Sequence, residues 1–310
     1  MAWRVRGRCG AATVDALRTD SDPQHPEGGR GRRALRRGVA GVKVVRSLAK
    51  LPKRAADAHK GDFGKVVIVA GSKGMLGAAV LCARAAARSG AGLVRVGLPE
   101  SLLSLLPLSV PEATTFVRTN KVLQEQVADA DAIVIGPGLT TDAISRQLVK
   151  LVLKHSRVPV VVDADALNVL APIHESVSAA PIVLTPHPGE AARLLGTTTQ
   201  RVQADRMQAV RELCERSEVT VVLKGNGTLV ADGERYYRNT TGNPGMASGG
   251  SGDVLSGLLG ALLARGLTPF EAASLGANIH GKAGDLACAA RGENGMVASD
   301  IIDAIAEVMR

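Results

Sequence analysis

The most unusual stretch of the sequence is a run of glycines directly before a carboxylate and an apolar segment. Gly249-Gly250-Ser251-Gly252 precedes Asp253, and the apolar run 254–263 begins at the next residue. Glycines packed this closely let successive backbone N–H groups point into one concavity, and a helix behind it adds the positive end of its dipole. We therefore predict a phosphate-binding anion hole made of Gly249, Gly250, Ser251 and Gly252.

Asp253 would lie beside that phosphate. A carboxylate in this place is costly unless it handles a proton or a metal ion. The alternative is a flexible glycine-serine loop in which Asp253 only caps the following helix. A glycine-rich loop alone is a weak signal, and its combination with the carboxylate and the apolar helix is what favours a functional site.

Other candidate residues follow predicted strands, at the edge where open α/β sheets bind ligands. Five such junctions occur, at 71–77, 136–139, 163–168, 185–190 and 224–228. The last of them, Lys224-Gly225-Asn226-Gly227-Thr228, offers a cation, glycine backbone and a hydroxyl, which suit a nucleotide phosphate. Gly136-Pro137-Gly138-Leu139 is either a ligand loop or a plain turn.

Two further junctions carry ionisable side chains. Asp163 and Asp165 put two carboxylates at one strand end, and helix capping is the alternative role for one of them. His187 lies between two prolines and close to Glu190. It has either a substrate-contact or a structural role. It lacks the second histidine or the cysteines of a zinc site, so we predict no metal ligand there.

Regular elements must hold these junctions at one edge. Continuous β-branched runs predict strands at 65–70, 92–97, 132–135, 158–163, 181–184 and 219–223, with a hairpin of 228–231 and 235–238. The helical patterns cover 78–89, 122–128, 141–155, 188–195, 200–217, 253–265, 269–290 and 299–309. Buried strands that alternate with helices predict an α/β fold, with a mostly parallel central sheet covered by helices on both faces.

The charge is concentrated at the N-terminus. The chain of 310 residues has a net charge of +9, yet residues 1–60 hold 15 Lys and Arg against 5 Asp and Glu. The remaining residues are close to neutral, which argues against a nucleic-acid partner. Residues 1–45 lack apolar periodicity and are predicted to be a disordered, dispensable basic leader, followed by one domain over 46–310. No apolar run has the roughly 20 residues that would span a membrane.

The motifs, taken in order, resemble those of the ADP-dependent NAD(P)H-hydrate dehydratases of the ribokinase-like superfamily. The matching pieces cover roughly residues 60–310 and are Val69-Ala-Gly-Ser with Gly77-Ala78, Ile135-Gly-Pro-Gly-Leu139, Val162-Asp-Ala-Asp-Ala-Leu-Asn168, Leu184-Thr-Pro-His-Pro-Gly-Glu190, Leu223-Lys-Gly-Asn-Gly-Thr228 and Thr241-Gly-Asn-Pro-Gly-Met-Ala-Ser-Gly-Gly-Ser-Gly-Asp-Val-Leu255. Two departures are visible. Ser251 replaces the usual Thr, and Thr140 stands where a glycine often follows Leu139.

The resemblance implies roles for individual residues. Ala78, Gly138, His187 and Asp253 would contact the hydrated nicotinamide, while Lys224, Gly225, Asn226, Gly227, Thr228 and Gly252 would bind the adenine nucleotide. Mg²⁺ as cofactor, ADP as co-substrate, a cytoplasmic location and a homo-oligomer, a homotetramer being one form, are also implied. Many relatives carry an N-terminal epimerase domain. The residues before 60 are too few for one, so epimerase activity is not expected.

The implied reaction makes the ring hydroxyl of hydrated NADH or NADPH a better leaving group. Phosphoryl transfer from ADP, with Asp253 as general base, would be followed by loss of phosphate, giving AMP and the repaired cofactor. Two alternatives stay open. A vitamin or sugar kinase on the same fold would stop at a phosphate ester, and a non-catalytic adenylate-binding module would have no use for Asp253.

Overall fold

Strands form where β-branched residues follow one another without polar interruption. In the computed structural model, which describes residues 42–310 apart from 52, 177 and 218, the run Lys65-Val-Val-Ile-Val69 is strand β2. All but the first of its residues are buried. Val160–Val162 (β6) is buried throughout. Strands of this kind must have helices on both faces.

The described residues form one ten-stranded sheet with the order β1-β10-β9-β8-β7-β6-β5-β2-β3-β4. Neighbouring strands from β8 to β4 in this order are parallel, whereas β9 is antiparallel to both β8 and β10. The remaining strands are β1 (Lys43–Val44), β3 (Leu93–Leu98), β4 (Ala113–Val117), β5 (Ala132–Ile135), β7 (Ile182–Leu184), β8 (Thr220–Leu223), β9 (Leu229–Ala231) and β10 (Arg235–Arg238). The mostly parallel sheet confirms the predicted fold class.

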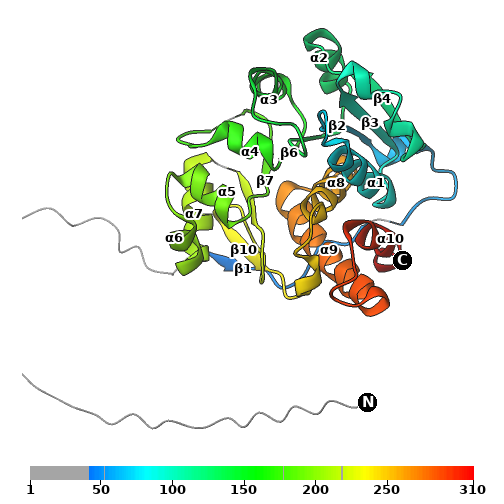
Figure 1. Cartoon of the computed structure of the whole chain (residues 1–310). Coiled ribbons are helices and arrows are strands. Elements are labelled where there is room, and N and C mark those ends of the chain that lie inside the picture. The colour runs from blue at the N-terminus through cyan, green and yellow to red at the C-terminus, as the bar shows by residue number, and fades with distance from the viewer. Residues whose placement is uncertain (1–41, 52, 177, 218) are drawn as a thin grey trace, which may run out of the picture. The chain divides into compact units, whose positions relative to one another are not determined.

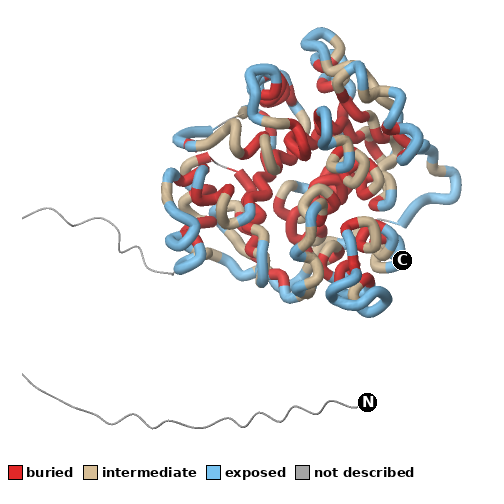
Figure 2. The backbone as a smooth tube through the Cα atoms, in the orientation of Figure 1, coloured by how far each residue is buried: buried red, intermediate tan, exposed pale blue. Residues whose placement is uncertain are grey.

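In most strands of the sheet, alternate residues belong to two separate apolar cores. Val66 and Ile68 of β2 belong to the core that contains helices α1, α8, α9 and α10. Val67 and Val69 belong to the core on the other face, which includes residues of α2 and α7 and of helices between them (Figure 1). Figure 2 shows the buried backbone between these two layers. The helices are α1 (Leu76–Arg88), α2 (Asn120–Ala128), α3 (Ala143–His155), α4 (Asp165–Leu170), α5 (Pro188–Leu195), α6 (Thr199–Ala204), α7 (Arg206–Ser217), α8 (Ser251–Ala264), α9 (Pro269–Arg291) and α10 (Ala298–Val308), with short 3-10 turns at Lys60–Phe63, Glu100–Leu102, Leu106–Leu108 and Pro244–Met246.

Helix α8 lies unusually close to its neighbours. A Cβ atom added at Gly257 would be 2.0 Å from the carbonyl oxygen of Cys82 in α1, and one at Gly260 would be 2.5 Å from a methyl group of Val134 in β5. Only glycine permits this approach at either position. The two glycines therefore seat α8 directly on α1 and the sheet.

Several elements differ from the sequence-based expectation. Strand β4 was not predicted, and the predicted helix 200–217 is broken into α6 and α7 at Asp205. Helix α8 begins at Ser251, two residues before the predicted start. Residues 1–41 of the predicted leader lie outside the described residues. Its end forms β1, whose neighbour Val45 donates a backbone hydrogen bond to Tyr236 at 2.8 Å. None of the helices in the described part of the chain is long and apolar enough to cross a membrane.

Candidate active site

The loops that follow the parallel strands are connected to one another at one edge of the sheet. The amide of Gly71 donates to the carbonyl of Pro137 at 2.8 Å, and the amide of Lys224 donates to that of Pro186 at 2.8 Å. A Cβ added at Gly136 would lie 1.8 Å from the Asp163 carbonyl oxygen, so these two loops touch through their backbones. Together with the contact of 2.7 Å between Lys224 Nζ and Asp163 Oδ1, these contacts bring the five predicted junctions together at one edge of the sheet.

A buried ion pair lies at the centre of this edge. Lys224 Nζ is 2.7 Å from Asp163 Oδ1, while Ser256 donates its hydroxyl to Asp163 Oδ2 at 2.8 Å. Glu190 adds a second carboxylate 3.7 Å from the same ammonium group. Burial opposes the charge on Lys224, but Asp163 and Glu190 outweigh it, so the pKa of Lys224 is raised. The ammonium group is therefore held charged at this point.

The predicted anion hole forms the first turn of α8. Gly250 is the N-cap residue with φ of 90°, a conformation that favours glycine, and a Cβ there would lie 2.3 Å from Leu81 Cδ1. Within the described residues no side chain caps this turn, and the Ser251 amide donates to the Ser248 carbonyl at 3.4 Å. A Cβ added at Gly252 would be 3.4 Å from Lys224 Nζ, which places the ammonium group beside the turn. Amides and ammonium together can hold a phosphoryl group.

Asp253 is the third residue of α8 and does not serve as its N-cap. Burial, followed by the negative charge of Asp163, raises the pKa of Asp253 to about 7. Lys224 lowers that pKa, and Asp165 and Glu190 raise it further. A carboxyl group with this pKa can accept a proton at neutral pH and is a better base than an ordinary aspartate.

The other two predicted carboxylates have roles that the sequence did not reveal. Asp163 is the ion-pair partner of Lys224, and Asp165 accepts a hydrogen bond from the Thr140 amide at 2.8 Å. The N-cap of α4 is Ala164, and no side chain caps that helix. The expectation that one of the two aspartates caps a helix is therefore wrong.

His187 is the N-cap of α5. Its Nδ1 accepts hydrogen bonds from the amides of Gly189 at 3.0 Å and Glu190 at 3.3 Å, while Glu190 Oε2 accepts from the His187 amide at 2.7 Å. Burial and then the positive charge of Lys224 lower the pKa of His187. A neutral ring that accepts at Nδ1 carries its proton on Nε2. His187 thus has a structural role, and its Nε2 lies 3.4 Å from Glu190 Oε1 with the side chain 51% exposed.

Ala78 and Gly138 lie side by side, as their common assignment requires. A Cβ added at Gly138 would be 3.0 Å from the Cβ of Ala78. Two residues on, Thr140 has φ of 74°, a conformation that favours glycine. The glycine often found here in the resembling family would be unstrained. In this chain the Thr140 hydroxyl compensates by donating to Asp142 Oδ2 at 2.8 Å.

The loop Lys224–Thr228 is flanked by two arginines that the sequence did not single out. A Cβ added at Gly225 would lie 3.0 Å from Arg206 Nη1, and one at Gly227 would lie 3.0 Å from Arg238 Nε. Arg206 also donates to the carbonyls of Leu223 at 3.1 Å and Lys224 at 3.2 Å. Asn226 is exposed, and the Thr228 hydroxyl donates to the Gly225 carbonyl at 2.9 Å. Two cations therefore face the glycine backbone of this loop.

A further cation reaches the site from the strand that was not predicted. Arg118 follows β4 and donates to the carbonyls of Ala70 at 3.0 Å and Gly71 at 2.7 Å. Burial, which outweighs the charge of Asp142, lowers the pKa of its guanidinium. Arg118 holds the loop after β2 in place. No sequence signal marked Arg118, because its importance comes from strand pairing.

The side chains at this edge of the sheet decide how the implied Mg²⁺ could be bound. Among the described residues, no three His, Cys, Asp or Glu side chains form a group that could hold a metal ion. Both oxygens of Asp163 already accept hydrogen bonds from Lys224 and Ser256. The chain therefore fits Mg²⁺ only as an ion carried by nucleotide phosphates and water, with Asp253 the nearest available carboxylate at the anion hole.

A mostly parallel sheet with a glycine-rich helix start, an aspartate of raised pKa and a lysine paired with a buried carboxylate at one edge is an arrangement of the ribokinase-like class. The comparisons narrow this class. A family described as NAD(P)H-hydrate dehydratase matches residues 66–307, and the chain belongs to this family. The resemblance inferred from the motifs is thereby confirmed.

Individual relatives agree with this family. The chain is 45% identical over 239 residues to the ADP-dependent (S)-NAD(P)H-hydrate dehydratase of Neisseria meningitidis, covering 75% of this chain and 80% of that protein. It is 43% identical over 277 residues to the bifunctional NAD(P)H-hydrate repair enzyme Nnr of Moorella thermoacetica, covering 84% of this chain and 52% of the relative. The chain spans about half the length of this and two other bifunctional relatives that it matches.

A solved structure supports the fold independently. The ADP/ATP-dependent NAD(P)H-hydrate dehydratase of Bacillus subtilis, co-crystallised with ATP and Mg²⁺, superposes with a TM-score of 0.76 at 33% identity. The match covers 84% of this chain and 93% of that one. A ribokinase-like superfamily protein of Enterococcus faecalis gives the same TM-score at 29% identity, with 87% and 96% covered.

Proposed function

We propose that the protein is an ADP-dependent (S)-NAD(P)H-hydrate dehydratase, a carbon–oxygen lyase that repairs hydrated NADH and NADPH. The observation that carries the proposal is Asp253, whose pKa is raised to about 7 beside the uncapped amides of the α8 first turn. Family membership and the similarity to a dehydratase over 80% of its length support the choice of substrate.

The reaction begins at the hydroxyl group of the hydrated nicotinamide ring. Asp253 takes the hydroxyl proton while the oxygen attacks the terminal phosphorus of ADP, and the bond to the AMP oxygen breaks. Donors that face the developing charge stabilise such a transition state more than the ground state. The amides of Gly250 and Gly252 and the Lys224 ammonium group are the donors proposed for this role.

The second half of the reaction removes phosphate. The lone pair of the ring nitrogen expels the phosphate, and loss of a proton from the neighbouring ring carbon restores the double bond. Ala78, Gly138 and the Nε2–H of His187 would position the ring. Mg²⁺, bound through the phosphates, would supply charge neutralisation. AMP, phosphate and reduced cofactor are the products.

The test is an assay of the purified protein with hydrated NADH, Mg²⁺ and either ADP or ATP. The repaired cofactor absorbs in the near ultraviolet, and we expect this absorbance to appear with AMP and phosphate in equal amounts when ADP is supplied. A stable phosphate ester without the absorbance would instead assign the protein to the small-molecule kinases. Nucleotide binding with no turnover would support a non-catalytic module.

The same proposal includes a cytoplasmic location and a homo-oligomer, with a homotetramer as one form. Family membership supports both. Sedimentation of the full chain measures the assembly directly, and a monomer at micromolar concentration would contradict this part of the proposal without affecting the reaction.

A further inference from the structure

His280 is an ionisable side chain that no step of the proposed reaction uses. It belongs to α9, and its Nε2 lies 3.5 Å from the hydroxyl oxygen of Ser251. Ser251 is the first residue of α8 and is only 8% exposed. It is also one of the residues predicted for the anion hole. The contact therefore joins α9 to the turn that is proposed to hold the phosphoryl group.

The backbone of α9 packs directly against α8 and against the loop that leads to the anion hole. A Cβ added at Gly276 would collide with a methyl carbon of Leu259 in α8, and one at Gly281 would collide with the Thr241 hydroxyl oxygen. Only glycine permits so close an approach at either position. The place of His280, the residue before Gly281, is thus set by backbone contacts with both neighbours.

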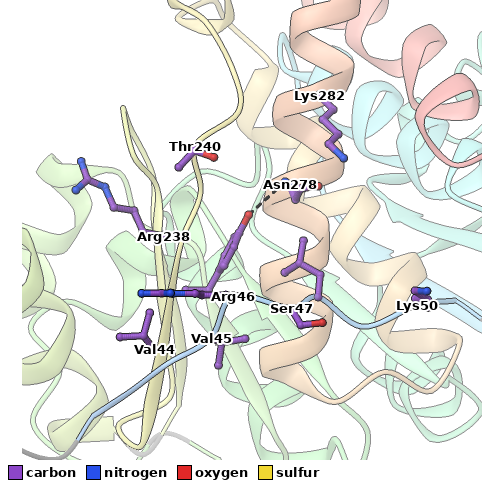
Figure 3. Close-up of a pocket in the computed structure, with 11 residues that line it drawn as sticks. Val44, Val45, Arg46, Ser47, Lys50, Arg238, Thr240, Asn278 and Lys282 are labelled. Atoms are coloured by element: carbon purple, nitrogen blue, oxygen red, sulfur yellow. Dashed lines mark hydrogen bonds between the residues drawn. The ribbon is translucent and has the colours of Figure 1, made fainter.

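Hydrogen bonds on either side of His280 hold α9 in the same place. Asn278 donates to the Tyr237 hydroxyl at 3.2 Å, which links α9 to β10 (Figure 3). Further along the helix, Asp285 accepts from the Gly242 amide at 3.0 Å. Residues two apart on a helix point to nearly opposite sides, so His280 faces away from Asn278. That orientation agrees with its contact to the first turn of α8.

The ring of His280 is neutral at neutral pH. Burial lowers the pKa of His280 to about 4, a hydrogen bond with the Ser251 backbone opposes this change, and the positive charge of Lys224 adds to it. A neutral imidazole offers one N–H donor and one acceptor nitrogen. His280 therefore lies within electrostatic range of the cation beside the anion hole and brings no charge of its own to it.

We propose that His280 is a positioning residue for phosphoryl transfer and acts through the Ser251 hydroxyl. A ring with its proton on Nε2 donates to Ser251 Oγ, and the hydroxyl hydrogen is then directed to an oxygen of the bound phosphoryl group. His280 itself touches neither the nucleotide nor the hydrate. The inference rests on the proposed dehydratase reaction and adds the Ser251 hydroxyl to the donors of the anion hole.

The test is a double-mutant cycle on kcat, with ADP and hydrated NADH as substrates. His280→Leu and Ser251→Ala should each lower kcat about tenfold and change the ADP KM less, because the hydroxyl acts mainly on the charge that develops during transfer. The double variant should fall no further than either single variant, since both changes remove the same interaction. Losses that multiply, or a normal kcat in His280→Leu, would overturn the proposal.

Two further variants separate positioning from stability. His280→Gln keeps an N–H donor and should recover part of the kcat that His280→Leu loses, and it replaces His280→Leu in the cycle if that variant folds poorly. Ile279→Val, a change at the neighbouring buried residue of α9, is the control and should lower the melting temperature with normal kcat. If kcat instead followed the melting temperature across these variants, His280 would have only a structural role.

A second readout keeps this inference separate from the proposed function. Calorimetric titration of inorganic pyrophosphate into the wild type and the variants repeats the cycle without the hydrate. Binding should weaken in His280→Leu and Ser251→Ala, and by no more in the double variant. A wild type without dehydratase turnover would contradict the proposed function, and the titration would then decide the role of His280. A wild type that turns over, with His280→Leu unchanged, would contradict the role of His280 alone.

Discussion

The two glycine-rich segments predicted to meet phosphate have opposite surroundings. Gly249–Gly252 begins a buried helix, and the charges that act on its Asp253 include the carboxylates of Asp163, Asp165 and Glu190 and the cation Lys224. Gly225–Gly227 is partly exposed and has Arg206 and Arg238 beside its backbone. Carboxylates therefore predominate around the first segment, and arginines lie beside the second.

This difference suggests that one segment mainly binds the nucleotide and the other mainly acts during phosphoryl transfer. A ground-state nucleotide, which is strongly negative, should be attracted by the two arginines and repelled by the carboxylates. The amides and Asp253 should contribute most when charge moves during phosphoryl transfer. Changes near Gly225–Gly227 should therefore affect nucleotide KM, and changes near Gly249–Gly252 should affect kcat.

Asp253→Asn should give the largest effect. Loss of a positioned base typically costs about 10²–10⁴-fold in rate, so kcat should fall by that order while ADP still binds. In the wild type, kcat should rise as pH increases through about 7, where Asp253 ionises, and this limb should disappear in the variant. Single-turnover rates measured from about pH 5 to about pH 9 test both expectations. Near-normal turnover would remove Asp253 from the chemistry.

Asp253→Asn, which should lower kcat, should raise the stability of the fold at high pH. The pKa of Asp253 is raised in the folded state, so the protonated form stabilises the fold and that contribution is lost as pH rises from about 4 to about 7. Asn is neutral at every pH. Asp253→Asn should therefore melt a few degrees above wild type at about pH 8 and close to wild type at about pH 4.

Lys224→Met should combine a large loss of stability with a shifted pH profile. It leaves Asp163 buried without its partner, a change that costs about 3–5 kcal/mol in comparable ion pairs. Because Lys224 lowers the pKa of Asp253, its removal should also move the rising limb of kcat to higher pH. Adding Asp163→Asn should restore part of the stability, and thermal unfolding of the single and double variants measures it.

Arg206→Gln with Arg238→Gln should raise the ADP KM about 30-fold and change kcat little, since each of the two charged contacts to phosphate contributes about 1 kcal/mol. Steady-state kinetics with ADP and hydrate varied in turn separate the two parameters. Arg146→Gln, on α3, is the control. A fall in kcat with unchanged ADP KM would reverse the proposed division between the two segments.

Thr140 offers the smallest and most local test. Its φ of 74° penalises any side chain, and its hydroxyl bonds to Asp142 and Ser145 offset part of that cost. Thr140→Gly removes the strain together with the hydroxyl, whereas Thr140→Ala removes only the hydroxyl. The glycine variant should be more stable than the alanine variant by about 1 kcal/mol, measured by denaturant unfolding. The reverse order would show that the backbone there is unstrained.

The parts of the fold that sequence predicted are those with a strong local signal. The β-branched run at 65–69 and the glycine turns after each strand located the functional edge, because parallel strands end there together. Strand β4 gave a weaker pattern, since Ala113–Val117 contains two threonines and is half exposed. Arg118 was missed with it. Lys43–Val44 was assigned to the leader because two residues carry no periodicity.

Side-chain partners could not be predicted in the same way. Asp163 and Asp165 are equivalent by position in the sequence, and only the fold shows that Lys224 pairs with the first and Thr140 with the second. Arg206 follows a helix break at Asp205 that neither glycine nor proline marks. Its contact with the Leu223 carbonyl depends on how α7 packs beside β8.

Gly257 and Gly260 help to fix the position of the amides at the anion hole. Gly257 lies seven residues beyond Gly250, roughly 10 Å along the helix axis at 1.5 Å per residue. Because α8 has no side chain at these two positions, its backbone lies directly against the Cys82 carbonyl of α1 and against a methyl group of Val134 in β5, which restricts how far the helix can roll or slide. The aim of the first-turn amides is thus set by two residues that touch no ligand. Enlarging either glycine would misdirect those amides even where the nucleotide contacts are untouched.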